Sequence, residues 1–262
     1  MRVSFIDVGK GDCILLQSGA SAALIDTGYD DTSQDVLAQL QACGVDRLEF
    51  LLVTHYDRDH IGGVGAIGEK IVIDTVYLPA YEGSDKHYRT LMATIGRLGL
   101  PTRTVAEKLS LGLGDVTLDV FPSGVAYVPG SGGDEGNDND MSLVATLVNG
   151  ADSYLFAGDL EKDGLEAYLD GRHGQFDVVK MPHHGRKCSF TDEFLEDARP
   201  QIAVITDSDD DPADKKTLKL LDEAGVDTYR TSAFGAITVQ SDGAGRYAVS
   251  SDSKSGYRSP SS

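Results

Sequence analysis

The sequence has 262 residues, of which 40% are hydrophobic, so it is long and apolar enough to bury a core, which excludes intrinsic disorder. Its formal net charge of -19 repels nucleic-acid phosphates, and we therefore expect no extended binding to duplex DNA. The three cysteines show no metal or redox spacing, and residues 1–5 lack the apolar core of a signal peptide. No apolar run approaches the ~18 residues of a membrane span. These features predict a cytoplasmic protein without a membrane segment. The oligomeric state stays open.

The first part of the chain predicts a sheet with one early helix. Short apolar or alternating runs separated by glycine-containing turns are typical of strands, and they occur at 3–8, 13–17, 22–26 and 50–54. Residues 35–43 carry apolar side chains at helical spacing, and Gly44 stands where a helix C-cap belongs.

The second part repeats the order of strands followed by helices. Strands are predicted at 109–121, 142–147, 154–157, 178–181, 202–205, 236–240 and 247–250. Helices are predicted at 162–169, 190–197 and 217–224. Two groups of strands, each followed by helices, indicate two sheets packed face to face with helices outside.

Two polar segments are expected to lie outside the packed elements. Residues 130–140 are too rich in glycine and acids to pack, so we expect a loop that rims a site. Residues 254–262 read as a disordered tail, which leaves a single domain over residues 1–253.

Four of the six histidines fall in two short clusters, THYDRDHIGG at 54–63 and PHHG at 182–185. In the first cluster an apolar strand ends and is followed within six residues by four ligand-type side chains, His55, Asp57, Asp59 and His60. Residues two apart in an extended chain share a side, so His55 and Asp57 can hold one ion while Asp59 and His60 diverge toward another. Turn acids and helix caps are the alternative, but this density at a strand end favours a metal site.

The second cluster follows another apolar strand. A lone histidine there would more often be structural, whereas the adjacent pair His183 and His184 before a glycine favours a site. The next two residues, Arg186 and Lys187, form a basic spot that suits a substrate phosphate or carboxylate, although a merely exposed pair is an equal alternative.

The first cluster resembles the HxHxDH signature of the metallo-β-lactamase superfamily, in the HxDxDH variant of the metallo-hydrolase domain of ComEC competence proteins and their stand-alone relatives. The resemblance extends over nearly the whole chain. Further matching segments occur in the family's order at 7–12, 24–28, 139–144, 156–159 and 179–185.

This resemblance implies an α/β (α+β) fold, the αββα sandwich of two mixed sheets flanked by helices, with the site at one edge of the sheets. It implies two metal ions bridged by Asp159, which taken alone could be a turn residue after a glycine. The implied ligands are His55, Asp57, Asp59, His60, Asp159 and His184. Asp59 is also expected to take part in catalysis, and His183 to contact the substrate or donate a proton.

Several matching positions and one departure refine this expectation. Asn139 or Asp140 could replace a third histidine ligand, although a plain loop acid is nearly as good an explanation for Asp140. Asp26, at a strand end, is expected to hydrogen-bond a ligating histidine. Asp12 matches the family without a predicted role. The family's late histidine is missing from the acidic run 207–214, so one metal position is expected to be weaker, or filled by an aspartate or water.

These residues predict metal-assisted hydrolysis, because two ions lower the pKa of a bridging water from ~15.7 toward ~7. The oxygen-rich ligand set without cysteine fits zinc or manganese. The resemblance favours a phosphodiesterase or nuclease acting on a small-molecule or single-stranded phosphodiester substrate. Hydrolysis of a lactam, lactone or thioester, and a non-catalytic metal-binding regulatory domain, are the alternatives.

Overall fold

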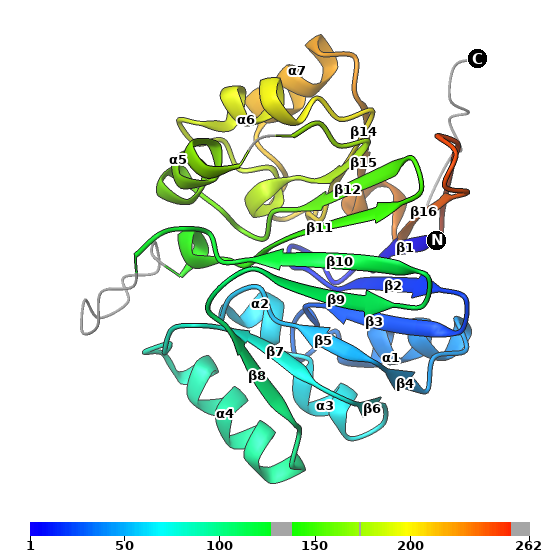
Figure 1. Ribbon diagram of the computed structural model, residues 1–262, viewed down its shortest axis with the longest axis vertical. Coiled ribbons are helices and arrows are strands. Elements are labelled where there is room, and N and C mark those ends of the chain that lie inside the picture. The colour runs from blue at the N-terminus through cyan, green and yellow to red at the C-terminus, as the bar shows by residue number, and fades with distance from the viewer. Residues whose placement is uncertain (127–137, 173, 253–262) are drawn as a thin grey trace.

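The computed structural model describes residues 1–126, 138–172 and 174–252. Figure 1 shows strands packed as two large sheets, with α1, α3 and α4 on one side and α5, α6 and α7 on the opposite side. These helices span Ser33–Ala42, Val64–Gly68, Lys86–Leu98, Lys162–Gly171, Thr191–Ala198 and Lys215–Glu223, respectively. The αββα sandwich that the sequence predicted is confirmed.

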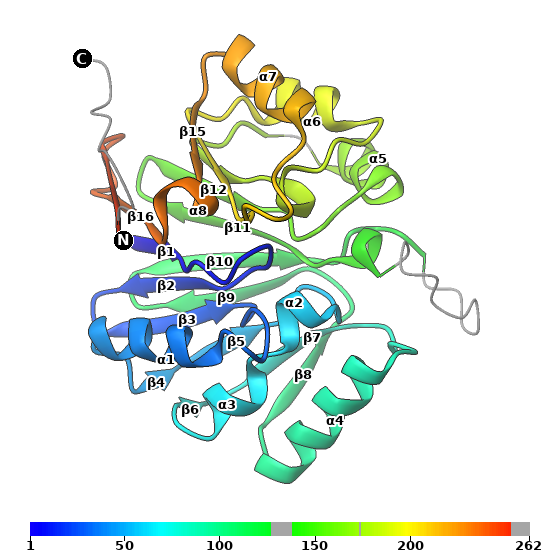
Figure 2. The ribbon, with the colours of Figure 1, turned by 180° about the vertical axis from the view of Figure 1, so that it is seen from behind.

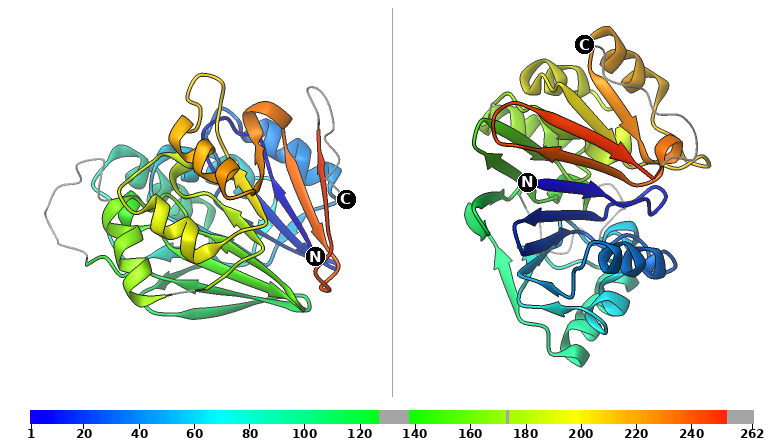
Figure 3. Two further views of the ribbon diagram at one scale, coloured as in Figure 1. Left: turned by 90° about the horizontal axis from the view of Figure 1, so that it is seen from above. Right: turned by 90° about the vertical axis from the view of Figure 1, so that its right-hand side faces the viewer.

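The first sheet has the strand order β17-β16-β1-β2-β3-β5-β7-β8. Its strands are β1 (Arg2–Phe5), β2 (Ile14–Ser18), β3 (Ser21–Ile25), β5 (Phe50–Leu52), β7 (Val76–Pro79), β8 (Thr102–Val105), β16 (Ile237–Ser241) and β17 (Tyr247–Ser251). Neighbours from β17 to β3 are antiparallel, and those from β3 to β8 are parallel. Figure 3 shows the closing hairpin of β16 and β17 beside β1.

The second sheet has the order β15-β14-β13-β12-β11-β10-β9. Its strands are β9 (Leu109–Leu113), β10 (Val116–Phe121), β11 (Val144–Asn149), β12 (Asp152–Phe156), β13 (Val178–Lys180), β14 (Ile202–Ile205) and β15 (Asp227–Arg230). The strands from β9 to β12 are antiparallel, and those from β12 to β15 are parallel.

Short elements complete the two halves. A small sheet pairs β4 (Arg47–Leu48) with β6 (Val72–Ile73). Figure 2 shows α1, α2 (Arg58–Ile61) and α3 on the near side of the first sheet. The helix α8 (Thr231–Phe234) precedes β16, and two 3-10 helices, η1 (Asn139–Met141) and η2 (Pro182–Gly185), flank the candidate site. No helix in the described part of the chain has the length and apolar character needed to cross a membrane.

The core lies in three layers that follow from strand alternation. In β2, Ile14 and Leu16 face the buried cluster between the two sheets, and Leu15 faces the cluster beneath α1, α3 and α4. A third buried cluster joins the second sheet to α5, α6 and α7. Successive side chains of a strand point to opposite faces, so strands buried on both faces are apolar throughout.

The structure corrects one predicted element and adds others. The single strand expected at 109–121 is a hairpin, because Gly114 adopts a φ of +54° and turns β9 back onto β10. No prediction covered β7, α4 or β8. Of the loop expected at 130–140, residues 130–137 lie outside the described residues, as does the tail at 254–262.

The topology brings the candidate segments to one edge. β1, β3, β5 and β7 run in one direction, and β12, β13 and β14 are mutually parallel, so the segments that follow them emerge together. Each of the two histidine clusters follows one of these strands.

Candidate metal centre

The first histidine cluster is placed by the end of β5 and the start of α2. The side chains of His55 and His60 are fully buried, whereas Asp59 is 17% exposed and Asp57 38% exposed. Asp57 occupies the N-cap position of α2, yet its side chain makes no capping hydrogen bond. Its carboxylate Oδ2 instead lies 3.7 Å from Nε2 of His55, so the helix-cap explanation does not account for this residue.

The second cluster has an unusual backbone. His183 and His184 adopt φ values of 43° and 52°, a left-handed conformation that costs ~1–3 kcal/mol for residues other than glycine and is found mainly at functional sites. The two side chains diverge as a result. His184 is buried against Asp159, while His183 is 18% exposed and places Nδ1 2.9 Å from Oε1 of Glu161.

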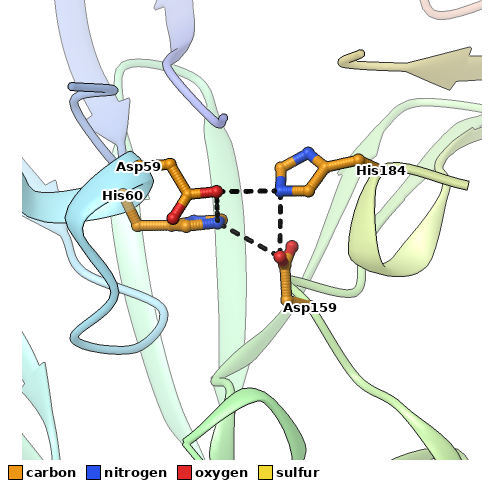
Figure 4. Close-up of side chains that lie close together, drawn as sticks. All are labelled: Asp59, His60, Asp159 and His184. Carbon is orange, nitrogen blue, oxygen red and sulfur yellow. Dashed lines mark ion pairs between the residues drawn. The ribbon is translucent and has the colours of Figure 1, made fainter. Parts of the chain in front are cut away.

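Four ligand-type side chains from the two halves converge, and we call them the four-ligand cluster: Asp59, His60, Asp159 and His184. Their ligand atoms all lie within 4.8 Å of one another. Figure 4 shows Asp59 and His60 of α2 facing Asp159 and His184 from the second half of the chain. Oδ2 of Asp159 lies 2.9 Å from Nε2 of His184 and 3.3 Å from Nε2 of His60.

The unpaired nitrogen atoms show that this cluster fits a metal. The Nε2 atoms of His55, His60 and His184 are buried, and none makes a hydrogen bond of good geometry within the described residues. A buried polar atom without a hydrogen bond costs ~1–3 kcal/mol, so an ion bound by the Nε2 atoms of His60 and His184, which both face Oδ2 of Asp159, would stabilise this site. Imidazole nitrogen and carboxylate oxygen are ligands that divalent transition metals accept.

The opposite nitrogen of each ring is fixed by the protein. Nδ1 of His60 lies 2.8 Å from Oδ2 of Asp26, and Nδ1 of His184 lies 3.0 Å from Oγ1 of Thr206. Nδ1 of His55 contacts the hydroxyl groups of Thr54 and Ser142 at 3.1 and 3.3 Å. Such contacts orient a ring so that its other nitrogen faces the ion.

Asp26 is itself held tightly. It has a φ of +56°, and its carboxylate accepts hydrogen bonds from the backbone N–H and the hydroxyl of Thr54, at 2.8 and 2.6 Å. Its contact with His60 is therefore part of a rigid arrangement at the end of β3.

A second metal position is less complete. His55 and Asp57 face each other, but among the described residues they join no group of three ligand atoms. The other group of three, formed by Asp12, Asp26 and His60, already has a cation at Asp12, since Nζ of Lys180 lies 2.6 Å from its Oδ2.

Two candidates of the 139–140 segment have other partners. Oδ1 of Asp140 accepts the backbone N–H groups of Glu161 and Gly164, at 2.9 and 2.7 Å, and so caps the start of α5. Asn139 donates from Nδ2 to Glu161 at 3.0 Å. Neither residue joins the four-ligand cluster.

The two basic residues after η2, Arg186 and Lys187, form ion pairs with different carboxylates. Arg186 forms an ion pair with Asp211 at 2.5 Å, and Lys187 forms one with Asp192 at 2.6 Å. The two cations thus have different carboxylate partners, and the role predicted for them in substrate binding stays a prediction.

Lys180 has no role among the sequence predictions, yet it is fully buried beside the four-ligand cluster. Its Nζ lies 2.6 Å from Asp12, 3.1 Å from Oδ1 of Asp159 and 2.9 Å from the carbonyl oxygen of Gly158. A lysine within the otherwise apolar strand β13 is the signal that could have identified it, because a buried lysine is rare unless paired.

These charges set the protonation of the cluster. Burial alone would raise the pKa of Asp159, but the charges of His184, Lys180 and His60 outweigh it and hold the pKa well below its usual value. Burial is likewise outweighed at Asp59, where the contact with His184, at 3.5 Å from its Nε2 to Oδ2 of Asp59, and the charge of His60 lower the pKa. These cations therefore keep both carboxylates ionised in the metal-free protein, which is the form that binds a metal, and a bound ion would take the place of the histidine charges.

Comparisons with known proteins agree with this arrangement. The model of the metallo-beta-lactamase superfamily matches residues 6–206. The chain is 25% identical over 258 residues to ComE operon protein 3 of Bacillus subtilis (strain 168), covering 90% of this chain and 32% of that protein. It is 29% identical over 211 residues to Competence protein ComA of Neisseria gonorrhoeae, covering 78% of this chain and 26% of that protein. The chain thus spans about a third or less of these relatives.

A solved structure also shares the fold. A mutant of CmlA beta-hydroxylase matches with a TM-score of 0.58 at 15% identity, covering 90% of this chain and 53% of that one. At this identity the likeness concerns the fold alone. Because the superfamily model matches well over half of the chain, the protein belongs to the metallo-beta-lactamase superfamily, and it is similar to competence proteins at modest identity.

Proposed function

We propose that the protein is a metal-dependent hydrolase of phosphodiester bonds with two divalent ions, zinc or manganese, as cofactors. The observation that carries this proposal is that the buried Nε2 atoms of His60 and His184 both face Oδ2 of Asp159, and that the ring of His55, whose buried Nε2 has no hydrogen bond, lies beside the ring of His60. Membership of a superfamily of hydrolases supports the reaction class. The phosphodiester substrate rests on the likeness to competence proteins.

The residues of the chain have distinct roles in this proposal. When bound, the ions supply Lewis-acid activation of water and of a phosphoryl oxygen. Asp59 is the most exposed member of the four-ligand cluster, which suits it to accept a hydrogen bond from the attacking water. His183 is partly exposed and held at Nδ1 by Glu161, so its Nε2 is the atom that would contact the substrate or protonate the leaving group.

The charge of the chain favours small or single-stranded substrates. A net charge of -19 repels a long duplex, whose many phosphates would meet an acidic surface, whereas two ions suffice for one phosphate. We therefore propose weak binding to long duplex DNA.

The proposal is tested on protein stripped of metal and reloaded with zinc or with manganese. The substrates are bis-p-nitrophenyl phosphate, a short single-stranded oligonucleotide and a long duplex, each across a salt series, with a β-lactam and a thioester as comparison substrates. Asp59→Asn removes one ligand, and Asp74→Asn, which breaks a solvent-accessible ion pair with Arg47 outside the four-ligand cluster, is its matched control.

We expect metal-dependent cleavage of the phosphodiesters, lost in Asp59→Asn and kept in Asp74→Asn. Activity confined to the lactam or thioester would overturn the substrate class. Metal binding without any hydrolysis would favour a regulatory domain, which the incomplete His55 and Asp57 position makes the competing function.

A further inference from the structure

Two cations from distant segments meet on a single carboxylate beside the metal centre. Nζ of Lys10, in the segment after β1, lies 3.5 Å from Oδ2 of Asp211. Arg186, just after η2, pairs with the other oxygen, Oδ1, at 2.5 Å. Both cations are therefore matched by one negative charge, which leaves one positive charge unbalanced within this group in an otherwise acidic protein.

Several contacts place this group next to the four-ligand cluster. Lys10 precedes Gly11, which packs so closely on Asp59 that a Cβ at Gly11 would lie 2.7 Å from the backbone oxygen of Asp59. Arg186 follows the ligand His184 by two residues. Close packing is also found behind η2, where a Cβ at Gly185 would lie 2.9 Å from the side chain of Ala213, two residues beyond Asp211.

Tyr29 links the group to the ligand side. Burial, together with the charge of Asp59, raises the pKa of Tyr29 to about 12, and the charge of Asp211 acts in the same direction. Tyr29 thus experiences the charges of both Asp59 and Asp211.

The pairing with Asp211 is weak enough to be exchanged. The side chains of Lys10, Arg186 and Asp211 are 22%, 41% and 40% exposed, and ion pairs at such positions contribute little to stability. A phosphate group offers more acceptor oxygens than a carboxylate and can carry more charge. The guanidinium group of arginine can form bidentate hydrogen bonds with it.

We propose that Lys10 and Arg186 form an anion subsite for a second phosphate group of the substrate, and that Asp211 occupies this subsite in the free protein as an internal competitor. The inference rests on the proposed function and deepens it, because it assigns the preferred substrate. That substrate carries a phosphate beside the scissile phosphodiester, as a 5′-phosphorylated dinucleotide does and bis-p-nitrophenyl phosphate does not.

The kinetic test uses the metal-loaded enzyme and a dithymidine dinucleotide with or without a 5′-phosphate. Lys10→Gln and Arg186→Gln should raise KM for the phosphorylated substrate by about threefold to tenfold at low salt, whereas Asp211→Asn should lower it by a similar factor. The unphosphorylated dinucleotide should show no such changes. Arg97→Gln and Glu69→Gln, which break an exposed ion pair between α4 and the residue after α3, are the charge-matched controls.

A binding titration separates this proposal from the proposed function. Inorganic phosphate should bind the metal-loaded Asp211→Asn protein more tightly than wild type, and the Lys10→Gln, Arg186→Gln double variant more weakly. An enzyme without phosphodiesterase activity that still shows these shifts would refute the proposed function and retain the anion subsite. Variants whose phosphate affinity and KM match those of the controls would refute the subsite itself.

Discussion

The ammonium group of Lys180 lies 3.1 Å from Oδ1 of Asp159, the carboxylate whose other oxygen faces His60 and His184. The lysine thus holds one oxygen and leaves Oδ2 directed at the ligand nitrogens. Burial alone would lower the pKa of Lys180, but the carboxylates of Asp12 and Asp159 outweigh burial and raise it, so the lysine is charged in the folded protein.

Replacing Lys180 with methionine should therefore destabilise the protein, because two buried carboxylates lose their common cation. Removing one partner of a buried ion pair costs ~3–5 kcal/mol. Urea unfolding of the metal-free protein measures this change. Lys219→Met, in an exposed pair with Glu223 on α7, is the control and should cost less than ~1 kcal/mol. Equal costs for the two variants would contradict the positioning role of Lys180.

The two metal positions should differ in affinity, because the four-ligand cluster is complete and the position at His55 and Asp57 is not. Elemental analysis of metal-loaded protein should find close to two ions, and stepwise dialysis against a chelator should remove one of them first. His55→Ala should keep one ion, while Asp159→Ala should lose both. His87→Ala, on α4, should lose none. Two ions retained in Asp159→Ala would exclude this carboxylate as the bridge.

Asp26→Asn should weaken metal binding without unfolding the protein. Asparagine tolerates the left-handed conformation that Asp26 adopts, so the backbone at φ +56° is preserved, but the carboxyl oxygen that contacts Nδ1 of His60 is replaced by an amide group. Changes to such outer contacts typically reduce metal affinity by ~10- to 100-fold. Competition with a chromogenic chelator measures the loss, and Asp30→Asn, in an exposed ion pair with Arg58, serves as the comparison. An unchanged affinity would show that Asp26 does not act through His60.

The sequence predicted those features that depend on local pattern. Strand runs, the histidine clusters and Asp26 at a strand end could be read because alternation and residue type carry the information. The break within 109–121 was missed because apolar and other residues alternate on both sides of the two-residue turn at Gly114 and Asp115. The pairing of Lys10 with Arg186 on Asp211 depends on how three loops approach one another, which no spacing in the sequence encodes.

Asp177 should contribute stability that depends on pH, independently of any metal. Its Oδ2 accepts hydrogen bonds from the backbone N–H and the hydroxyl of Ser153, at 2.9 and 2.7 Å, and its Oδ1 accepts one from Gln201 at 2.7 Å. Burial alone would raise the pKa of Asp177, but the hydrogen bonds outweigh it and lower the pKa. The folded state therefore binds this proton less readily than the unfolded state does.

The sign of the effect follows from that difference. A carboxyl with a lowered folded pKa stabilises the protein above the unfolded value, about 3.9, and this contribution disappears as the pH falls through the folded pKa. Asp177→Asn should lower the free energy of unfolding by about 1–2 kcal/mol at pH 7, a range that allows for the partial exposure of Asp177. The difference in unfolding free energy between variant and wild type should shrink below about pH 4. Urea unfolding of both metal-free proteins between pH 7 and pH 3 tests this, since their difference cancels the other carboxyl groups. A difference that stays constant with pH would show that shape, and not the charge of Asp177, accounts for the loss.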